Sequence, residues 1–251
     1  MPLKTYDKLG VGYNSYRRPD PRFAARIRAA LGDAASVLNV GAGAGSYETE
    51  DLPLIAVELS ATMIRQRPPN SAPCVQASVE ALPFADRSFD SVLAVLTVHH
   101  WTQRDAGLRE LRRVAGRRIV FLTWDPEFDE QFWLTRDYLP EILELDRRRF
   151  PKLTTFQNAL GVASLEIEPL PVPADCTDGF RSAYWKLPHR YLDPDARKSI
   201  SAFAMLDPAI VTRGLASLAK DLESGEWRRR NRDLESLDAL DVGHRIVIAK
   251  L

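Results

Sequence analysis

VLNVGAGAGS, residues 37–46, joins an apolar run to three glycines at alternate positions. Glycine has no Cβ, so the backbone at Gly41, Gly43 and Gly45 can adopt conformations that other residues avoid and can lie against a ligand. Open α/β sheets bind nucleotide-like cofactors where a strand enters such a turn and a helix leaves it. The stretch therefore predicts an α/β fold with a cofactor at this turn. A tight turn that binds nothing is the alternative.

The spacing of the glycines distinguishes between cofactors. The dinucleotide fingerprint requires Gly-x-Gly-x-x-Gly. Gly41 and Gly43 fit it, but Ser46 takes the sixth position and the third glycine comes one residue early. The spacing argues against a nicotinamide-dependent oxidoreductase. It resembles the first motif of Rossmann-like S-adenosylmethionine-dependent methyltransferases, in which an acidic residue precedes Gly-x-Gly-x-Gly.

Apolar runs alternate with helical patterns along the first half of the chain. Asp20-Pro21, Ser60 and Thr102 are expected to begin helices, and Gly116 to end the helix that Thr102 begins. Strands are predicted over residues 36–40, 54–57, 73–76, 89–98, 118–123, 165–170 and 244–249. We expect an α/β fold, a doubly wound and mostly parallel seven-stranded sheet with helices on both faces and a helical insertion near the C-terminus.

Helical periods dominate the second half, notably over 131–145 and 208–222. We assign residues 1–173 and 234–251 to a Rossmann-like domain, and 174–233 to a helical cap over the substrate side. Aromatic residues in this cap suit a flat or partly apolar substrate, although aromatic residues also build cores. They are Tyr184, Trp185 and Tyr191.

Composition limits the kinds of partner. The chain has 34 basic and 34 acidic residues, so no charge excess indicates nucleic acid or an anionic membrane. No signal pattern or bilayer-spanning apolar run is visible, which predicts a cytoplasmic protein. Cys74 and Cys176 are expected to be buried apolar residues, and no metal site is predicted from the histidine and cysteine spacing. The arginines at 147–149 and 228–232 are expected to lie on solvated helix faces.

Glu58 follows the second predicted strand, 17 positions after Gly41. Neighbouring parallel strands end at one crevice, so this carboxylate is expected near the glycine turn. A carboxylate there can accept hydrogen bonds from both hydroxyls of a ribose. An exposed surface glutamate is the alternative.

Two further segments carry a family resemblance. Residues 77–84, ASVEALPF, followed by Asp86, Phe89-Asp90 and Val92, resemble the third and fourth motifs of the methyltransferase type 11 group. Residues 13–19, YNSYRRP, resemble the N-terminal segment that folds over the cofactor in that group. In the family's order the motifs span residues 13 to 123, about half of the chain, and they specify fold and cofactor but not substrate.

The resemblance implies S-adenosyl-L-methionine as cofactor, with S-adenosyl-L-homocysteine as product. It implies that the glycine turn holds the methionine part, Glu58 the ribose, Leu59 one adenine face, and the segment after the third strand the adenine edge. Arg18, or alternatively Arg17, would meet the methionine carboxylate. The implied cofactor-binding residues are Tyr16, Arg18, Gly41, Ala42, Gly43, Glu58, Leu59, Ser78, Val79, Glu80 and Leu96, the last through its carbonyl.

Two positions depart from the family pattern. Asn39 and Ser78 stand where the family usually has acidic residues. Asparagine keeps an acceptor oxygen but lacks the charge that favours a cationic ligand, and serine has a shorter reach. We expect both changes to weaken the affinity for the cofactor without preventing binding.

The sequence indicates catalytic residues less clearly than cofactor-binding residues. His100, beside His99 after the fourth strand, and Asp125, after the fifth, are candidate general bases. A structural histidine packed beside the cofactor is the alternative for His100. The predicted function is methyl transfer to a small organic acceptor whose oxygen, nitrogen or carbon atom is not assigned. The competing hypothesis is a protein that binds the cofactor for structure or regulation, without methyl transfer.

Overall fold

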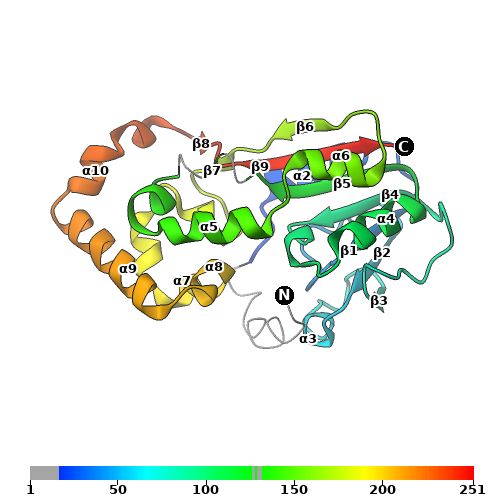
Figure 1. Ribbon diagram of the computed structural model, residues 1–251, viewed down its shortest axis with the longest axis horizontal. Coiled ribbons are helices and arrows are strands. Elements are labelled where there is room, and N and C mark those ends of the chain that lie inside the picture. The colour runs from blue at the N-terminus through cyan, green and yellow to red at the C-terminus, as the bar shows by residue number, and fades with distance from the viewer. Residues whose placement is uncertain (1–16, 126–127, 129–131) are drawn as a thin grey trace.

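A seven-stranded sheet in the order β3-β2-β1-β4-β5-β9-β6 organises the protein, whose computed structural model describes residues 17–125, 128 and 132–251 (Figure 1). The first five strands in this order, from β3 through β2, β1 and β4 to β5, run parallel. Strand β9 lies between β5 and β6 and is antiparallel to both. The strands are β1 (Val37–Val40), β2 (Leu54–Glu58), β3 (Cys74–Gln76), β4 (Phe89–Val95), β5 (Ala115–Trp124), β6 (Glu166–Pro169) and β9 (His244–Lys250). The predicted fold class, a mostly parallel seven-stranded sheet, is confirmed.

Helices cover both faces of the sheet. Successive strand residues point to opposite faces, so Leu93 and Val120 join one apolar cluster while Val92 and Phe121 join another. Helix α2 (Pro21–Leu31) packs on the first cluster, and α4 (Arg104–Val114) and α6 (Leu153–Leu160) pack on the second. The central strands are therefore buried on both sides, as a doubly wound sheet requires.

Local signals place some helix ends correctly and others wrongly. Asp20 caps α2 through its side chain, which accepts a hydrogen bond from the backbone N–H of Arg22, as predicted. Helix α4, however, begins at Arg104 rather than after Thr102. Gly116 does not end this helix, because β5 already begins at Ala115 and pairs with Phe89. A Cβ on Gly116 would lie 3.2 Å from the carbonyl oxygen of Phe89, so the glycine permits close strand packing.

The fourth strand also ends earlier than expected. It stops at Val95, and the chain turns at Leu96, whose φ of 47° is in the left-handed region. A 3₁₀ helix, η2 (Val98–His100), follows. The predicted strand to residue 98 is therefore wrong, and this turn brings Leu96 and the two histidines to the carboxyl edge of the sheet.

A group of helices lies beyond the carboxyl ends of the parallel strands, on the left of Figure 1. We call it the helical region. It comprises η4 (Leu134–Tyr138), α5 (Pro140–Arg149), η5 (Arg181–Tyr184), η6 (Pro188–Leu192), α7 (Pro194–Lys198), α8 (Ser201–Met205), α9 (Pro208–Glu223) and α10 (Glu226–Arg230). A Cβ on Gly214 of α9 would lie 2.5 Å from a side-chain carbon of Leu139, so α9 packs tightly against the segment between η4 and α5. The domain boundary at residue 174 stays a prediction.

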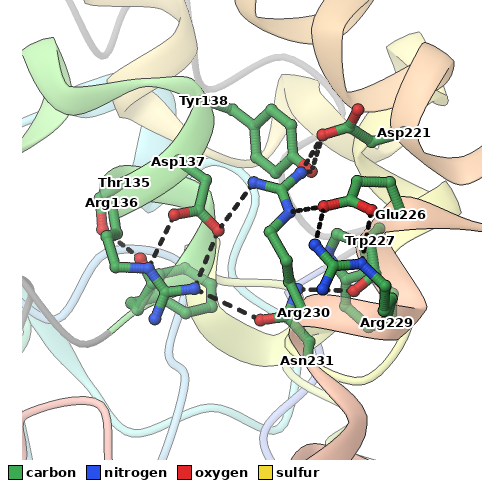
Figure 2. Close-up of polar contacts among 11 residues, drawn as sticks. Thr135, Arg136, Asp137, Tyr138, Asp221, Glu226, Trp227, Arg229, Arg230 and Asn231 are labelled. Atoms are coloured by element: carbon green, nitrogen blue, oxygen red, sulfur yellow. Dashed lines mark hydrogen bonds and ion pairs between the residues drawn. The ribbon is translucent and has the colours of Figure 1, made fainter.

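Polar contacts attach α10 to the π-helical turn η4 (Figure 2). The guanidinium of Arg230 donates to the hydroxyl of Tyr138 at 2.9 Å and forms an ion pair with Asp221 of α9. It also lies 3.7 Å from Asp137, which pairs with Arg136 at 2.7 Å. One arginine thereby links three elements.

The aromatic residues expected to face a substrate build a core instead. Trp185 and Tyr191 are fully buried, and Tyr184 packs against Tyr191 with ring centroids 5.8 Å apart. Their role in substrate recognition is not supported.

Cys74 and Cys176 are free and only partly buried. Within the described ranges, no helix is long and apolar enough to cross a bilayer. The same ranges contain no cluster of potential metal ligands.

Candidate active site

The glycine turn begins where β1 ends. Gly41 has φ of +67°, and a Cβ at this position would lie 2.0 Å from the hydroxyl oxygen of Thr97. The backbone N–H groups of Gly41 and Ala42 both donate to the carbonyl oxygen of Val57, at 2.8 and 3.0 Å. The turn is thus anchored to the neighbouring strand β2, and only glycine fits its first position.

Glu58 closes the same turn from the end of β2. Its two carboxylate oxygens accept hydrogen bonds from the backbone N–H groups of Gly43 and Ser60, both at 2.8 Å. Ser60 in turn caps helix α3 (Ala61–Ile64). Each carboxylate oxygen has a second lone pair, so the group can accept two further hydrogen bonds.

A first cavity of about 720 Å³ opens between these elements. Five of the predicted cofactor residues line it: Gly41, Ala42, Gly43, Glu58 and Leu96. The wall also contains residues that the sequence patterns did not indicate. They are Ala44, Ser46, Tyr47, Met63, Val95 and Thr97.

Other predicted contacts lie outside the described wall of this cavity. Leu59 is 39% exposed, and the Ser78 hydroxyl bonds to the Glu80 carboxylate. Val79 is buried, and a Cβ on Gly107 of α4 would lie 3.2 Å from its side chain. The predicted roles of Leu59 beside the adenine, and of Ser78, Val79 and Glu80 along its edge, stay predictions.

The N-terminal segment contributes Arg17 rather than Arg18 to the cavity wall. Arg18 is exposed, and Tyr16 lies outside the described residues. The Arg17 guanidinium makes two hydrogen bonds to the carboxylate of Asp178, which also accepts one from the hydroxyl of Tyr47 at 2.8 Å. For the contact with the methionine carboxylate, the family resemblance implied Arg18, with Arg17 as the alternative.

Asn39, the first departure from the family pattern, is 1% exposed and lines the first cavity. Its amide nitrogen donates to Glu48 at 3.3 Å, and Glu48 pairs with Arg67 at 2.8 Å. Its oxygen Oδ1 is buried and has no hydrogen-bond partner among the described residues. Buried polar atoms are normally satisfied, so this acceptor fits a ligand donor.

The first cavity therefore fits S-adenosylmethionine in three respects. It offers a glycine turn whose first position has no room for a Cβ, a carboxylate with capacity for two hydroxyls, and an unsatisfied buried acceptor. These features lie on β1, β2 and the turn between them, where parallel sheets bind such ligands.

A second cavity of about 680 Å³ adjoins the first. Arg17, Leu96 and His100 line both. The remaining wall comes from η2, β5, β9 and the helical region with its adjoining segments. It consists of His99, Trp124, Asp146, Arg149, Phe150, Phe180, Arg181, Ser182, Ser199, Ile200, Ser201, Ala202 and His244.

His100 lies at the junction of the two cavities. Burial, and next the positive charge of Arg149, lowers its pKa from 6.5 to about 3, so the ring is neutral near pH 7. Arginine can only donate, and Nη2 of Arg149 lies 3.2 Å from Nδ1 of His100. Nδ1 is therefore the acceptor and Nε2 carries the proton. A general-base role for His100 requires Arg149 to release Nδ1, and it stays a prediction.

Asp125 follows β5, and its backbone N–H donates to the carbonyl oxygen of Gly243 at 2.7 Å. Among the described residues, its neighbour Trp124 lines the second cavity and Asp125 does not. Its role as a base also stays a prediction.

The expectation for the arginines at 147–149 needs correction. The side chain of Arg149 is 11% exposed and that of Arg181 is 12% exposed, and both lie beside Asp146, which is 5% exposed. Arg148 is 80% exposed, as expected of a solvated face. A helical signal was available, because Ile142, Asp146 and Arg149 recur at the spacing of one buried face of α5.

Comparisons with known proteins identify the family of this chain. The family model described as "Methyltransferase domain" matches residues 38–118. A solved structure of a candidate methyltransferase from an antibiotic biosynthesis pathway of Anabaena variabilis is 31% identical, with a TM-score of 0.85. The alignment covers 94% of this chain and 99% of that one. The chain belongs to the S-adenosylmethionine-dependent methyltransferases.

Curated relatives match over shorter stretches. A malonyl-[acyl-carrier protein] O-methyltransferase from Erwinia pyrifoliae is 33% identical over 128 residues, 47% of this chain and 49% of that protein. A ubiquinone/menaquinone biosynthesis C-methyltransferase from Hahella chejuensis is 47% identical over 49 residues, 18% of this chain and 20% of that protein. The chain thus spans about half or less of these relatives.

Proposed function

We propose that this chain transfers the methyl group of S-adenosylmethionine to a small organic acceptor in the second cavity. The observation that carries the proposal is the shared wall of the two cavities. The first has the turn and carboxylate that suit an adenosine ligand, and Arg17, Leu96 and His100 separate it from the second. When bound, S-adenosylmethionine supplies a methyl group on a sulfonium sulfur that leaves as a neutral thioether.

The residues of the chain bind and orient the reactants and exclude water. Glu58 would hold the ribose, and the turn at Gly41 and Gly43 the methionine part. The carbonyl of Leu96, turned by its positive φ, would meet the ammonium group. Because the methyl donor is already activated, the main contribution of the protein to the rate of methyl transfer is the alignment of donor and acceptor.

The proposal does not specify whether the atom that receives the methyl group is oxygen, nitrogen or carbon. The two relatives are named for O- and C-methyl transfer, respectively. We further propose that residues 174–233 act as a cap over the acceptor. Function in the cytoplasm without nucleic-acid or membrane partners is likewise a proposal, supported by the balanced charge of the chain.

Two measurements test this function. Calorimetry should detect binding of S-adenosylmethionine and S-adenosylhomocysteine, and a metabolite screen with methyl-labelled cofactor should yield a labelled product. Absence of binding would contradict the proposal. Binding without any labelled product would favour the competing hypothesis of a non-catalytic binder, for which the known relatives give no support.

A further inference from the structure

We propose that the second cavity recognises its acceptor by a carboxylate group, held by the guanidinium groups of Arg149 and Arg181. The flat or apolar body of the acceptor would lie against Trp124, Phe150 and Phe180. This inference rests on the proposed methyl transfer and adds the class of the acceptor, a small organic acid.

The two arginines come from different elements and meet at one carboxylate. Arg149 ends α5 and Arg181 begins η5, yet both contact Asp146. The Arg181 guanidinium hydrogen-bonds to Asp146, and Nη1 of Arg149 lies 3.9 Å from the other carboxylate oxygen, so both guanidinium groups lie near one carboxylate at the cavity wall. A guanidinium has five N–H donors in a planar fork, which allows it to bind Asp146 and a second carboxylate together.

The charge of the wall favours an anion. The described residues of the wall include three arginines, the third being Arg17, and one carboxylate, Asp146. Burial is the main cause that lowers the pKa of each histidine in the wall, so these rings are neutral near pH 7: His99, His100 and His244. Arg17 is paired with Asp178, which leaves Arg149 and Arg181 against the one carboxylate of Asp146, so a carboxylate that enters this cavity still meets an excess of positive charge.

Aromatic rings next to the arginines favour a flat body. The guanidinium of Arg181 lies 4.7 Å from the ring centroid of Trp124. The ring of Phe150 packs edge-on against Trp124 at 5.1 Å. Phe180 lies on another part of the wall, 4.6 Å from the ring of His244. Such rings bind planar apolar groups by stacking and edge contacts.

The position of the arginines places the anchoring group in the second cavity. Within the described walls, Arg149 and Arg181 line the second cavity alone, whereas Leu96 and His100 line both. The methyl group has to arrive at the shared wall. The carboxylate is the proposed anchor, and because Nη2 of Arg149 lies 3.2 Å from Nδ1 of His100, it would be held close to this shared wall.

Matched acid and amide probes test this inference. Binding of benzoate, benzamide, cinnamate and cinnamamide to the protein loaded with S-adenosylhomocysteine is measured by calorimetry. Each acid and its amide share shape and differ in charge. We expect each acid to bind at least about tenfold more tightly than its amide, the effect of a hydrogen bond to a charged group.

Variants assign the effect to residues. Arg149→Gln and Arg181→Gln should each weaken acid binding about tenfold or more, while amide affinity stays the same. Arg181→Lys, which keeps the charge but loses the fork, should fall between Arg181→Gln and the unaltered protein. Arg190→Gln is the matched control, because Arg190 is 44% exposed in the same region and does not line the described cavity wall.

Different results contradict different claims. Equal affinity for acids and amides, no acid binding, or acid affinity retained in both glutamine variants would overturn the inference. If the variants melt early, the acid and amide comparison on the unaltered protein still decides. Failure of S-adenosylhomocysteine to bind would contradict the proposed function itself, so the two failures are distinguishable.

Discussion

At Glu58, two backbone N–H groups, one from the glycine turn and one from the residue that caps α3, converge on one carboxylate. Both oxygens are needed as acceptors, one for Gly43 and one for Ser60. A glutamine offers only one acceptor oxygen, so its NH₂ group would face one of the two N–H donors. The charge of this side chain, and not only its shape, therefore holds the turn.

Glu58→Gln should raise the dissociation constant of S-adenosylhomocysteine about tenfold to a hundredfold, the effect of losing a hydrogen bond to a charged group. Calorimetry measures it. Glu50→Gln, at an exposed position of the loop after the turn, serves as the control and should leave the constant unchanged. An unaltered constant in Glu58→Gln would exclude the carboxylate from ribose binding.

The sequence patterns identified site residues to different extents, for a physical reason. Gly41 and Glu58 were predicted because each ends a strand whose apolar run is visible in the chain, and parallel strands end at one edge. Arg149 was misassigned as solvated because one of its polar contacts, with His100, comes from 49 residues earlier in the chain. Its partner Arg181 and the unsatisfied oxygen of Asn39 have no local signal at all.

At the scale of elements, the glycine turn and the link between η4 and α10 show two ways of fixing a backbone. The turn depends on the absence of a side chain at Gly41. The link depends on one long side chain, Arg230, which reaches Tyr138 and Asp221 (Figure 2). Each can be tested by a single substitution with a matched control.

Gly41→Ala should lower the free energy of unfolding by about 3 kcal/mol, since its Cβ meets Thr97 in addition to the cost of a positive φ. Gly161→Ala separates the two causes. Gly161 has φ of +62° but no atom within 4 Å of the added Cβ, so only the backbone cost of about 1 kcal/mol remains. Urea unfolding measures both, and equal losses would contradict the steric explanation.

Arg230→Gln should lower the free energy of unfolding by about 1 to 2 kcal/mol, because the hydroxyl of Tyr138 and the carboxylate of Asp221 lose the charged donor that they share, while the hydroxyl still donates to Asp221. Hydrogen exchange should also accelerate in α10. Arg228→Gln is the control, because Arg228 is 76% exposed and its ion pair with Glu235 contributes little. Similar losses in both variants would show that the contacts of Arg230 do not stabilise the region.

At the scale of the whole molecule, the helical region and the sheet meet around a buried, neutral histidine. His244 begins β9, is 4% exposed and packs against Phe180. Burial, and next Arg181, lowers its pKa to about 3. In the unfolded chain the same group titrates near its ordinary value of 6.5. Between these two values the unfolded chain binds a proton that the folded chain does not.

Stability should therefore fall as the pH is lowered from 6.5 towards 3. At pH 5 this one group should cost about 2 kcal/mol relative to pH 7. Urea unfolding at pH 7, 6 and 5 measures the slope, which His244→Asn should reduce. His189→Asn, at an exposed position, should not change it. An unchanged slope in His244→Asn would show that this histidine does not contribute to acid sensitivity.

The fold class was predictable because the whole sheet follows from apolar runs and their connections. The predicted strands at 165–170 and 244–249 correspond to β6 and β9. The walls of the second cavity were not predictable in the same way. They combine α5, η5 and β9, which no local pattern brings together, and the aromatic residues chosen from the sequence are core residues of the helical region.

The place of β9 between β5 and β6 has a consequence for how the chain is made. Among the strands that the structure describes, β6 pairs with β9 alone, yet it precedes β9 by the whole of η5 to α10. During synthesis on the ribosome, β6 therefore has no strand to pair with until residues 244–250 have emerged. Most helices of the helical region are therefore synthesised before β9 can join β5 to β6, and β9 then completes both the sheet and, through His244, the wall of the second cavity.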